Sequence, residues 1–169
     1  MNPITIATPL GKMCACATER GICMFEFADD PAKTARRLKE LEKYFGKAVE
    51  SAAADTHLDR LTEELDRYFA GKLRGFTVSL DMAGTDFQKK AWNALVSIPY
   101  GQTVSYKQQA EATGNVKAVR AVALANSRNR VLIVVPCHRV IGSDGSLTGF
   151  NGGLDRKQRL LDLERTGKI

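Results

Sequence analysis

The hydrophobic pattern of the chain changes character at Gly84, and this change limits the folds open to it. Before that glycine, short segments typical of strands (ITIA, MCACAT and ICMFEF) precede two helical segments, and FTVSL predicts a further strand. After it, helix signals follow one another through short connections. We therefore predict an α+β fold, with a small sheet-and-helix lobe over residues 1–83 and a mainly helical lobe over residues 84–169.

The first lobe shows clear helix signals, and none of its residues is a candidate for a catalytic role. One helix is predicted to begin at the cap Asp30, with Pro31 in its first turn, and a second to begin at the cap Thr56 and end at Gly71. The apolar positions recur at helical spacing: Ala35, Leu38, Leu41 and Phe45 in one helix, and Leu58, Leu61, Leu65 and Tyr68 in the other.

Composition places the chain among globular proteins, with 44% hydrophobic and 26% charged residues. No apolar stretch approaches the roughly 20 residues that cross a bilayer, and the start resembles no signal peptide. We expect a cytosolic protein with reduced thiols and no membrane contact. Cys14, Cys16 and Cys23 lack the Cys-x-x-Cys spacing of structural zinc sites, so we expect them to pack as small hydrophobes and to bind no metal.

The net charge of +6 is concentrated in the second half of the chain. Residues 1–80 hold 12 basic and 12 acidic residues, whereas residues 81–169 hold 13 and 7. Between Ala112 and Ser143 all the charged residues are basic: Lys117, Arg120, Arg128, Arg130 and Arg139. Such a field suits a polyanionic partner, although a basic face can also serve only for solubility.

Two short helices with a tight turn between them are predicted within this basic region. A helix over residues 85–97, capped by Thr85, precedes them; Ser105 caps YKQQAEAT, GN breaks it, and VKAVRAVALAN follows. This is the helix-turn-helix pattern, which an ordinary helical hairpin also shows. The second helix is rich in alanine: Ala118, Ala121, Ala123 and Ala125. These small side chains would let the helix approach a DNA groove closely while Arg120 reaches the base stack. Alternatively, they would pack in the core.

A candidate reaction centre follows the apolar run VLIVVP at 131–136, which predicts a buried strand or extended segment. Cys137 leaves that segment, and His138 and Arg139 could favour its reactive thiolate, although a cysteine in apolar surroundings is usually inert. Adjacent side chains of an extended chain diverge, so a bridging water is the easier link between Cys137 and His138. Glu164 could orient the imidazole, or be a solvated acid on a surface helix.

The chain resembles the O6-alkylguanine-DNA alkyltransferases in four motifs: PCHRV at 136–140, PYGQTVSY, GNVKAVRAVALAN and GGL at 152–154. It also has Asn129 eight residues before the cysteine, as that family does. The resemblance covers nearly the whole chain and is strongest from Gly84 to Glu164. It implies a one-shot repair protein that acts on O6-alkylguanine flipped out of duplex DNA. It also implies minor-groove binding, no cofactor and a monomer.

The resemblance also implies roles for particular residues. Cys137 would take the alkyl group, with His138 acting through a water, Glu164 holding His138, and Asn129 bracing the turn. Arg120 would replace the extruded nucleotide, and Tyr106 would aid its rotation and donate a proton to guanine. Further DNA contacts are implied at Lys107, Asn115, Lys117, Ala121 and Ser143, and pocket positions at Val140, Phe150, Asn151 and Gly152.

One pocket residue departs from the commonest family pattern, because Phe150 stands where a tyrosine is usual. Backbone donation from Asn151 survives this change, whereas a phenolic role at position 150 does not. Two other functions fit the residues less well. A non-catalytic lesion binder is opposed by the intact Cys137, and a thiol hydrolase is opposed by the absence of protease signatures and leaves the basic helices unexplained.

Overall fold

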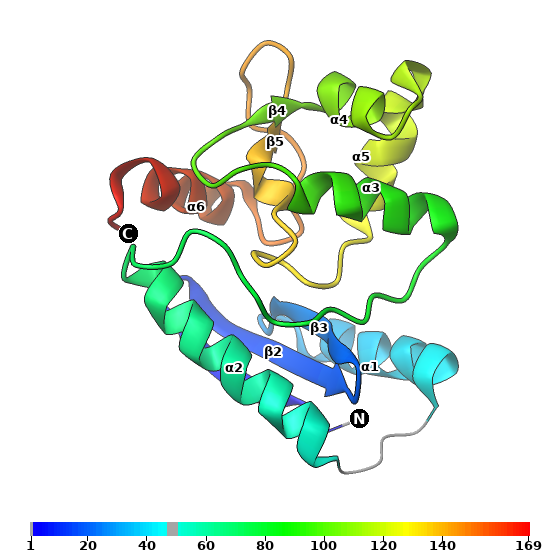
Figure 1. Ribbon diagram of the computed structural model, residues 1–169, viewed down its shortest axis with the longest axis vertical. Helices are drawn as coiled ribbons and strands as arrows, with labels where there is room; N and C mark the ends of the chain where they lie inside the picture. Colours follow the sequence, from blue (N-terminus) through cyan, green and yellow to red (C-terminus); the bar gives the residue numbers. More distant parts are fainter. Residues whose placement is uncertain (1, 47–50) are drawn as a thin grey trace. The chain divides into compact units, whose positions relative to one another are not determined.

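The computed structural model describes residues 2–46 and 51–169. The chain forms two compact units, Met1–Ala83 and Gly84–Ile169, and each has its own hydrophobic cluster. The first unit holds a small sheet and two long helices, and the second is mainly helical (Figure 1). The predicted α+β fold, with a sheet lobe followed by a helical lobe, is confirmed.

The sheet of the first unit is an antiparallel meander of β1 (Ile4–Thr8), β2 (Gly11–Thr18) and β3 (Gly21–Phe27). Period-2 alternation places Cys14 and Cys16 on one face of β2. These two thiols join Cys23 and Leu41 in a buried cluster, and all four cysteines of the chain are free.

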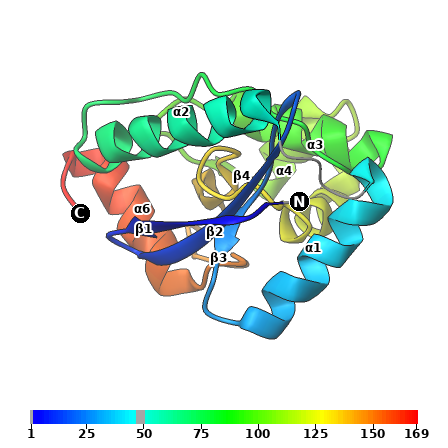
Figure 2. The same cartoon turned by 90° about the horizontal axis from the view of Figure 1, so that it is seen from below.

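Helices α1 (Pro31–Phe45) and α2 (Ala52–Phe69) lie on opposite faces of this sheet (Figure 2). Asp30 caps α1 as predicted, accepting a hydrogen bond from the Lys33 backbone N–H. The predicted cap at Thr56 is wrong, because α2 already begins at Ala52: the run Ala-Ala-Ala-Asp is compatible with helix, and the Thr56 hydroxyl donates back to the Ala52 carbonyl. The predicted apolar face is buried: Leu58, Leu61, Leu65 and Tyr68.

FTVSL at 76–80 does not form the predicted strand. It touches the sheet at a single bridge between Ile22 and Leu80. The competing partner is the buried Glu64 carboxylate on α2, which accepts hydrogen bonds from the Thr77 and Val78 backbone N–H groups. These backbone N–H groups of the segment therefore bind a carboxylate, which is a strong acceptor, and do not pair with a neighbouring strand.

Three helices of the second unit pack around one hydrophobic cluster: α3 (Asp86–Val96), α4 (Tyr106–Ala112) and α5 (Val119–Ser127), with the 3-10 turn η1 (Val116–Ala118) leading into α5. Capping boxes at Thr85 and Ser105 begin α3 and α4 where the sequence predicts. Trp92 of α3 donates to the Ala125 carbonyl of α5 at 2.8 Å, and the buried Gln109 and Asn126 pair across α4 and α5.

The remaining elements frame the candidate site. Strands β4 (Val104–Ser105) and β5 (Val140–Ile141) pair in parallel between α6 (Leu154–Thr166) and the α3–α5 group (Figure 1). The 3-10 turn η2 (Cys137–Arg139) leads directly into β5. The PCHRV motif therefore lies on a short turn next to a buried strand pair.

The apolar run at 131–136 is buried, as predicted, but it folds into turns instead of an extended segment. Asn129 supplies hydrogen bonds that a neighbouring strand would have supplied: its Oδ1 accepts from the Val131 N–H, and its Nδ2 donates to the Val135 carbonyl. Ile133 has a φ of 72°, which a β-branched residue rarely adopts. A strained turn held by side-chain bonds is typical of functional sites.

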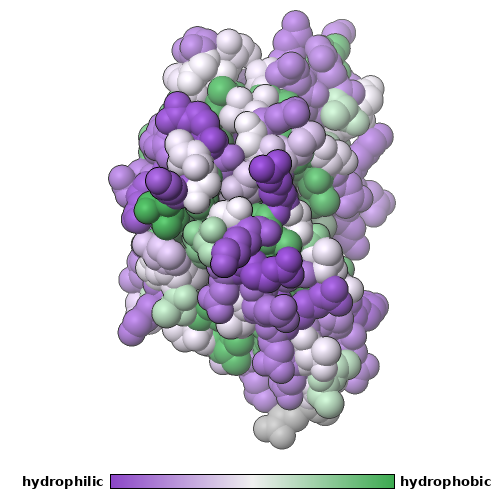
Figure 3. Space-filling view, turned by 60° about the vertical axis from the view of Figure 1, so that its left-hand side comes forward, coloured by the Kyte–Doolittle hydropathy of each residue, from purple (hydrophilic) through white to green (hydrophobic). Residues whose placement is uncertain are grey.

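In the described part of the chain, no helix is long and apolar enough to span a membrane. On the face shown in Figure 3, hydrophilic residues dominate and hydrophobic residues appear as separate spots. Scattered apolar exposure of this kind is ordinary for a globular protein.

Candidate active site

Cys137 begins the η2 turn, and only 4% of it is exposed. Its Sγ accepts a hydrogen bond from Asn129 Nδ2 at 3.2 Å, the same amide nitrogen that donates to the Val135 carbonyl at 2.9 Å. Asn129 follows the end of α5 almost directly. One side chain thus holds both the turn that presents the thiol and the thiol itself.

The Cys137 thiol is protonated in the free protein at neutral pH. Burial raises its pKa to about 11, against the smaller lowering effects of the Asn129 hydrogen bond and the Lys157 charge. The expectation that His138 and Arg139 would favour a thiolate is wrong for this resting state, because both side chains bind Glu164. Proton removal therefore requires a base at the moment of reaction.

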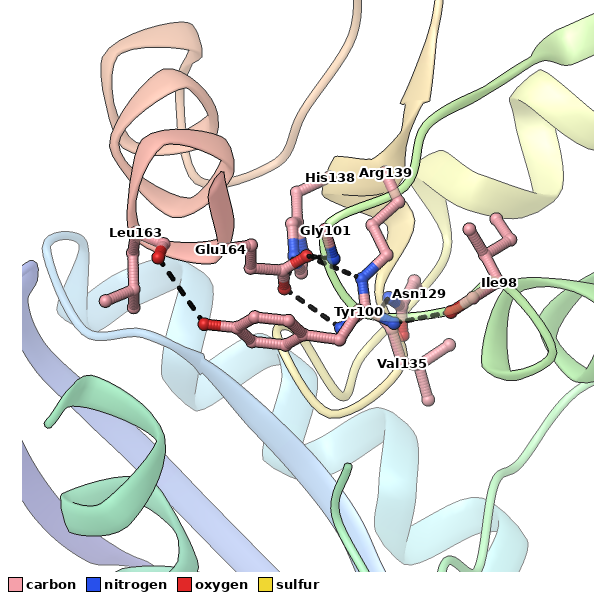
Figure 4. Close-up of polar contacts among 9 residues, drawn as sticks. All are labelled: Ile98, Tyr100, Gly101, Asn129, Val135, His138, Arg139, Leu163 and Glu164. Carbon is pink, nitrogen blue, oxygen red and sulfur yellow. Dashed lines mark hydrogen bonds and ion pairs between the residues drawn. The ribbon is translucent and has the colours of Figure 1, made fainter. Parts of the chain in front are cut away.

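His138, Arg139 and Glu164 form a buried charge cluster (Figure 4). The Glu164 carboxylate binds His138 Nε2 through Oε1 at 2.8 Å, and Arg139 binds both carboxylate oxygens at 2.9 Å. Burial alone would raise the pKa of Glu164, but the bonds and charges of His138 and Arg139 hold that pKa well below its usual range. Glu164 is thus a buried carboxylate and not the surface acid that the sequence left open.

This carboxylate fixes the tautomer of His138. Burial lowers the pKa of His138 below its usual value, against the opposing effect of Glu164, so the ring is neutral at pH 7. A neutral ring carries one proton, which Nε2 must hold to donate to Glu164. Nδ1 then bears a free lone pair, and among the described residues it has no hydrogen-bond partner. Nδ1 of His138 is therefore free to accept a proton.

Several contacts that sequence reasoning missed hold the cluster in place. Glu164 Oε2 also accepts from the Gly101 N–H at 3.1 Å, and Arg139 donates to the Ile98 carbonyl at 2.6 Å while lying 5.8 Å from the Tyr100 ring centre (Figure 4). Gly101 has a φ of 76°, in the region that favours glycine. The Pro-Tyr-Gly motif could have signalled this role, because it is a turn that must bring a backbone donor to a fixed place.

A second group that the sequence analysis missed is Lys157, which is fully buried on α6. Its ammonium donates to the Val140 carbonyl at 2.6 Å, the Thr148 carbonyl at 2.7 Å and the Gly149 carbonyl at 3.4 Å. These bonds tie the loop after β5 back onto the strand that follows Cys137. No motif reveals such a lysine, because its partners are backbone carbonyls that any sequence would supply.

The predicted pocket residues lie along this loop. Tyr106, at the start of α4, donates to the Thr148 carbonyl at 3.0 Å, and burial raises the pKa of its phenol. Phe150 is half-buried, with its ring edge-on to His138 at 6.5 Å between centres. Asn151 Nδ2 donates to the Ser127 carbonyl at the end of α5. Val140 and Gly152 are buried. The loop therefore brings pocket candidates close to His138.

The candidate DNA-contact residues are exposed on α4, η1, α5 and the loop after β5: Lys107, Asn115, Lys117, Arg120, Ala121 and Ser143. Asn115 also caps η1, accepting from the Lys117 N–H. The alanines divide between the two alternatives left open. Ala118 and Ala125 pack in the core with Val122, whereas Ala121 is exposed. Basic side chains and Ala121 thus share the open side of α5.

A helical unit with a buried, hydrogen-bonded cysteine beside a histidine–glutamate pair and a basic helix face defines a class of DNA-acting thiol proteins. Two family models match the chain: the DNA binding domain of 6-O-methylguanine DNA methyltransferase over residues 86–166, and the ribonuclease-like domain of the same protein over residues 3–82. A methylated-DNA–protein-cysteine methyltransferase of Methanosarcina barkeri is 42% identical over 94% of both chains. The chain therefore belongs to the methylated-DNA–protein-cysteine methyltransferase family.

Other relatives agree. The protein of that name from Mycobacterium leprae is 57% identical over 60% of this chain, and the match spans 62% of that relative's length. Among solved structures, Mycobacterium tuberculosis OGT in complex with DNA has a TM-score of 0.78 and 38% identity, covering 97% of this chain and 92% of that chain.

Proposed function

We propose that this protein repairs DNA by transferring the alkyl group of O6-alkylguanine to Cys137. The observation that carries the proposal is the buried relay from Glu164 through His138, whose Nδ1 is free to accept a proton next to a hydrogen-bonded thiol. The Cys137 proton passes through a water to Nδ1. Sulfur then bonds the alkyl carbon as the bond from that carbon to O6 breaks, and guanine leaves.

The leaving guanine needs a proton, which Tyr106 supplies in this proposal. Its phenol now donates to the Thr148 carbonyl, and that carbonyl also accepts from Lys157. Tyr106 can therefore turn to the base without leaving the Thr148 carbonyl unpaired. The raised pKa of the phenol keeps it protonated until it is needed.

Alkyl transfer uses up the protein, because nothing in the relay removes an alkyl group from a thioether. His138 can take a proton from a thiol, but an S–C bond offers it none. The product is therefore stable and each chain acts once. A thiol that is protonated at rest also suits a single-use protein, since thiols react with adventitious electrophiles less readily than thiolates.

The partner in this proposal is duplex DNA, bound in the minor groove as a monomer. The O6 group is hidden in a duplex, so the nucleotide must be flipped, and Arg120 fills the space it leaves. Backbone contacts that read little sequence are those a repair protein needs. They fall to the half-buried Tyr106 and to exposed residues on α4, η1, α5 and the loop after β5: Lys107, Asn115, Lys117, Ala121 and Ser143.

The flipped base would lie against the loop of Phe150, Asn151 and Gly152, with Val140 behind it. Phe150 offers an apolar surface where a tyrosine is usual, and Lys157 holds the loop at Thr148 and Gly149. In this scheme residues 84–169 carry DNA binding and transfer, and residues 1–83 are structural. Free thiols suit a cytoplasmic location.

The test is transfer of a labelled methyl group from O6-methylguanine in a duplex oligonucleotide. Wild-type protein should retain the label, and Cys137→Ala should retain none while binding the duplex with nearly unchanged affinity, because the thiol makes little of the DNA contact. Cys23→Ala, at a buried thiol of the other unit, is the control and should label fully. Label on Cys137→Ala would overturn the assignment.

A further inference from the structure

Two large apolar side chains stand exposed on either side of Arg120. Val116, in η1, is 46% exposed, and Leu124, in α5, is 60% exposed. They precede and follow Arg120 by four residues each. Arg120 and Leu124 lie four apart on α5 and so share one side of that helix, whereas Val116 lies in the 3-10 turn that leads into it. Ala118, Val122 and Ala125 pack in the core instead. The exposed residues therefore run apolar, basic and apolar along the chain.

Single exposed hydrophobes are ordinary, but the surroundings of this pair are not. Lys117 and Arg128 are exposed nearby, and the sequence from Ala112 to Ser143 contains no acidic residue. Such a basic frame favours a polyanion over an apolar protein partner. Minor-groove proteins also combine basic side chains with apolar ones that pack against the DNA.

We propose that Val116 and Leu124 are apolar contacts with duplex DNA, packing against the sugars and base edges that flank the nucleotide replaced by Arg120. This inference rests on the proposed function and adds to it a non-ionic part of the DNA-binding surface. Leu124 is the stronger contact, being larger and more exposed in the free protein. Because sugars are the same at every step, the contact adds affinity without reading sequence.

The ionic and apolar contributions can be separated by salt. Replacing a lysine that touches a phosphate lowers the slope of log affinity against log salt by about 1, because one fewer counterion is released. Removing an apolar contact lowers affinity equally at every salt concentration and leaves that slope unchanged. Leu124→Ala and Lys117→Ala should therefore both weaken binding but differ in slope.

The experiment measures binding of undamaged duplex DNA over a range of salt, and the rate with an O6-methylguanine duplex relative to the rate with free O6-benzylguanine. Leu124→Ala should lose about tenfold in affinity, from the lost burial of the side chain, and the rate ratio should fall. Leu124→Met should keep the wild-type affinity and rate ratio. Leu124→Gln, whose side chain is similar in length but polar, should lower the affinity and the rate ratio. Alanine, methionine and glutamine all suit a helix, so the fold should survive.

Val96→Ala is the matched control, because Val96 is 50% exposed on α3 and lies outside this face. It should leave affinity and rate ratio unchanged. Unchanged affinity in Leu124→Ala, or a loss equal to that in Val96→Ala, would overturn the inference while leaving the proposed function intact. Failure of the wild-type protein to bind duplex DNA would instead overturn the proposed function itself.

Discussion

At the scale of single residues, the proposed reaction depends on the buried pair of His138 and Glu164, with Arg139 bound to the same carboxylate. The Glu164 carboxylate fixes the proton of His138 on Nε2 and so leaves Nδ1 free to act as the proposed base. Arg139 balances the carboxylate with two hydrogen bonds. Sequence alone suggested the Glu164–His138 pair, but it could not show that Arg139 serves this carboxylate and not the thiol, because the turn η2 decides where each side chain points.

The pH profile of the reaction tests the base. Burial lowers the pKa of His138, so its Nδ1 lone pair is available at every pH above that lowered value. The rate with free O6-benzylguanine should be flat between about pH 7 and pH 9 and fall only below the usual histidine pKa of about 6.5. A rate that climbs steadily from pH 7 to pH 9 would show that the thiol is deprotonated by solvent hydroxide and not by His138.

Glu164→Gln should slow alkylation by about tenfold or more, because an amide holds the imidazole less firmly and does not stabilise its charged form. Glu164 raises the pKa of His138, so its loss should also move the acid limb of the pH profile to lower pH. Asp162→Asn, at a half-buried acid of the same helix that pairs with Arg165, is the control. An unmoved acid limb in a folded Glu164→Gln protein would remove Glu164 from the relay.

Lys157→Met should lower the rate, because the methionine keeps the length of the side chain but removes the lysine donor from the carbonyls of Val140 and Gly149, and leaves Thr148 with Tyr106 alone. Unfolding free energy should fall by about 1–3 kcal/mol, the cost of unpaired buried polar groups. Lys89→Met, at an exposed lysine of α3, should change neither quantity. Chemical denaturation and O6-benzylguanine kinetics measure both, and normal values for Lys157→Met would contradict the role given to Lys157.

At the scale of elements, the sequence predicted what local signals control and missed what distant partners control. Capping residues located α1, α3 and α4, because a cap acts on its own helix. The strand predicted over 76–80 does not form, because the Glu64 carboxylate binds its backbone N–H groups. The extended segment predicted over 131–136 does not form, because hydrogen bonds of Asn129 close it into turns. Both competitors are polar side chains outside the segment that was misjudged.

The same limit applies to α5. The alanines of η1 and α5 could not be divided from sequence between core and surface, and only packing against α3 and α4 shows that Ala118 and Ala125 face inward. Exposure of Arg120 then makes it the candidate for insertion into the base stack. The relay and the helix meet at Asn129 and at the Asn151–Ser127 hydrogen bond, which connect the end of α5 to the site.

Arg120→Ala should slow repair of an O6-methylguanine duplex by at least about tenfold more than it slows reaction with free O6-benzylguanine. Only the duplex substrate must be flipped, at a cost of a few kcal/mol that an inserted side chain partly offsets. Arg159→Ala, at an exposed arginine of α6, serves as the comparison for general loss of positive charge. Equal losses on both substrates would assign Arg120 to the fold and not to flipping.

At the scale of the whole molecule, the units Met1–Ala83 and Gly84–Ile169 divide the chemistry unevenly. The Glu164–His138 relay, Lys157 and the basic residues of α5 all lie in the second unit, which the DNA binding family model also covers. The first unit contributes three buried thiols, none of which has a base like His138 beside it in the described structure. We therefore expect a single reactive cysteine in the molecule.

Intact-mass measurement after incubation with excess O6-methylguanine duplex tests this central claim most directly. The account predicts one methyl-sized addition per chain, located at Cys137 by peptide mapping, with no further addition at longer times. The amount of guanine restored in the oligonucleotide should equal the amount of protein alkylated. Protein that was alkylated beforehand should repair no further base. More than one repaired base per chain, or a methyl group on Cys14, Cys16 or Cys23, would contradict it.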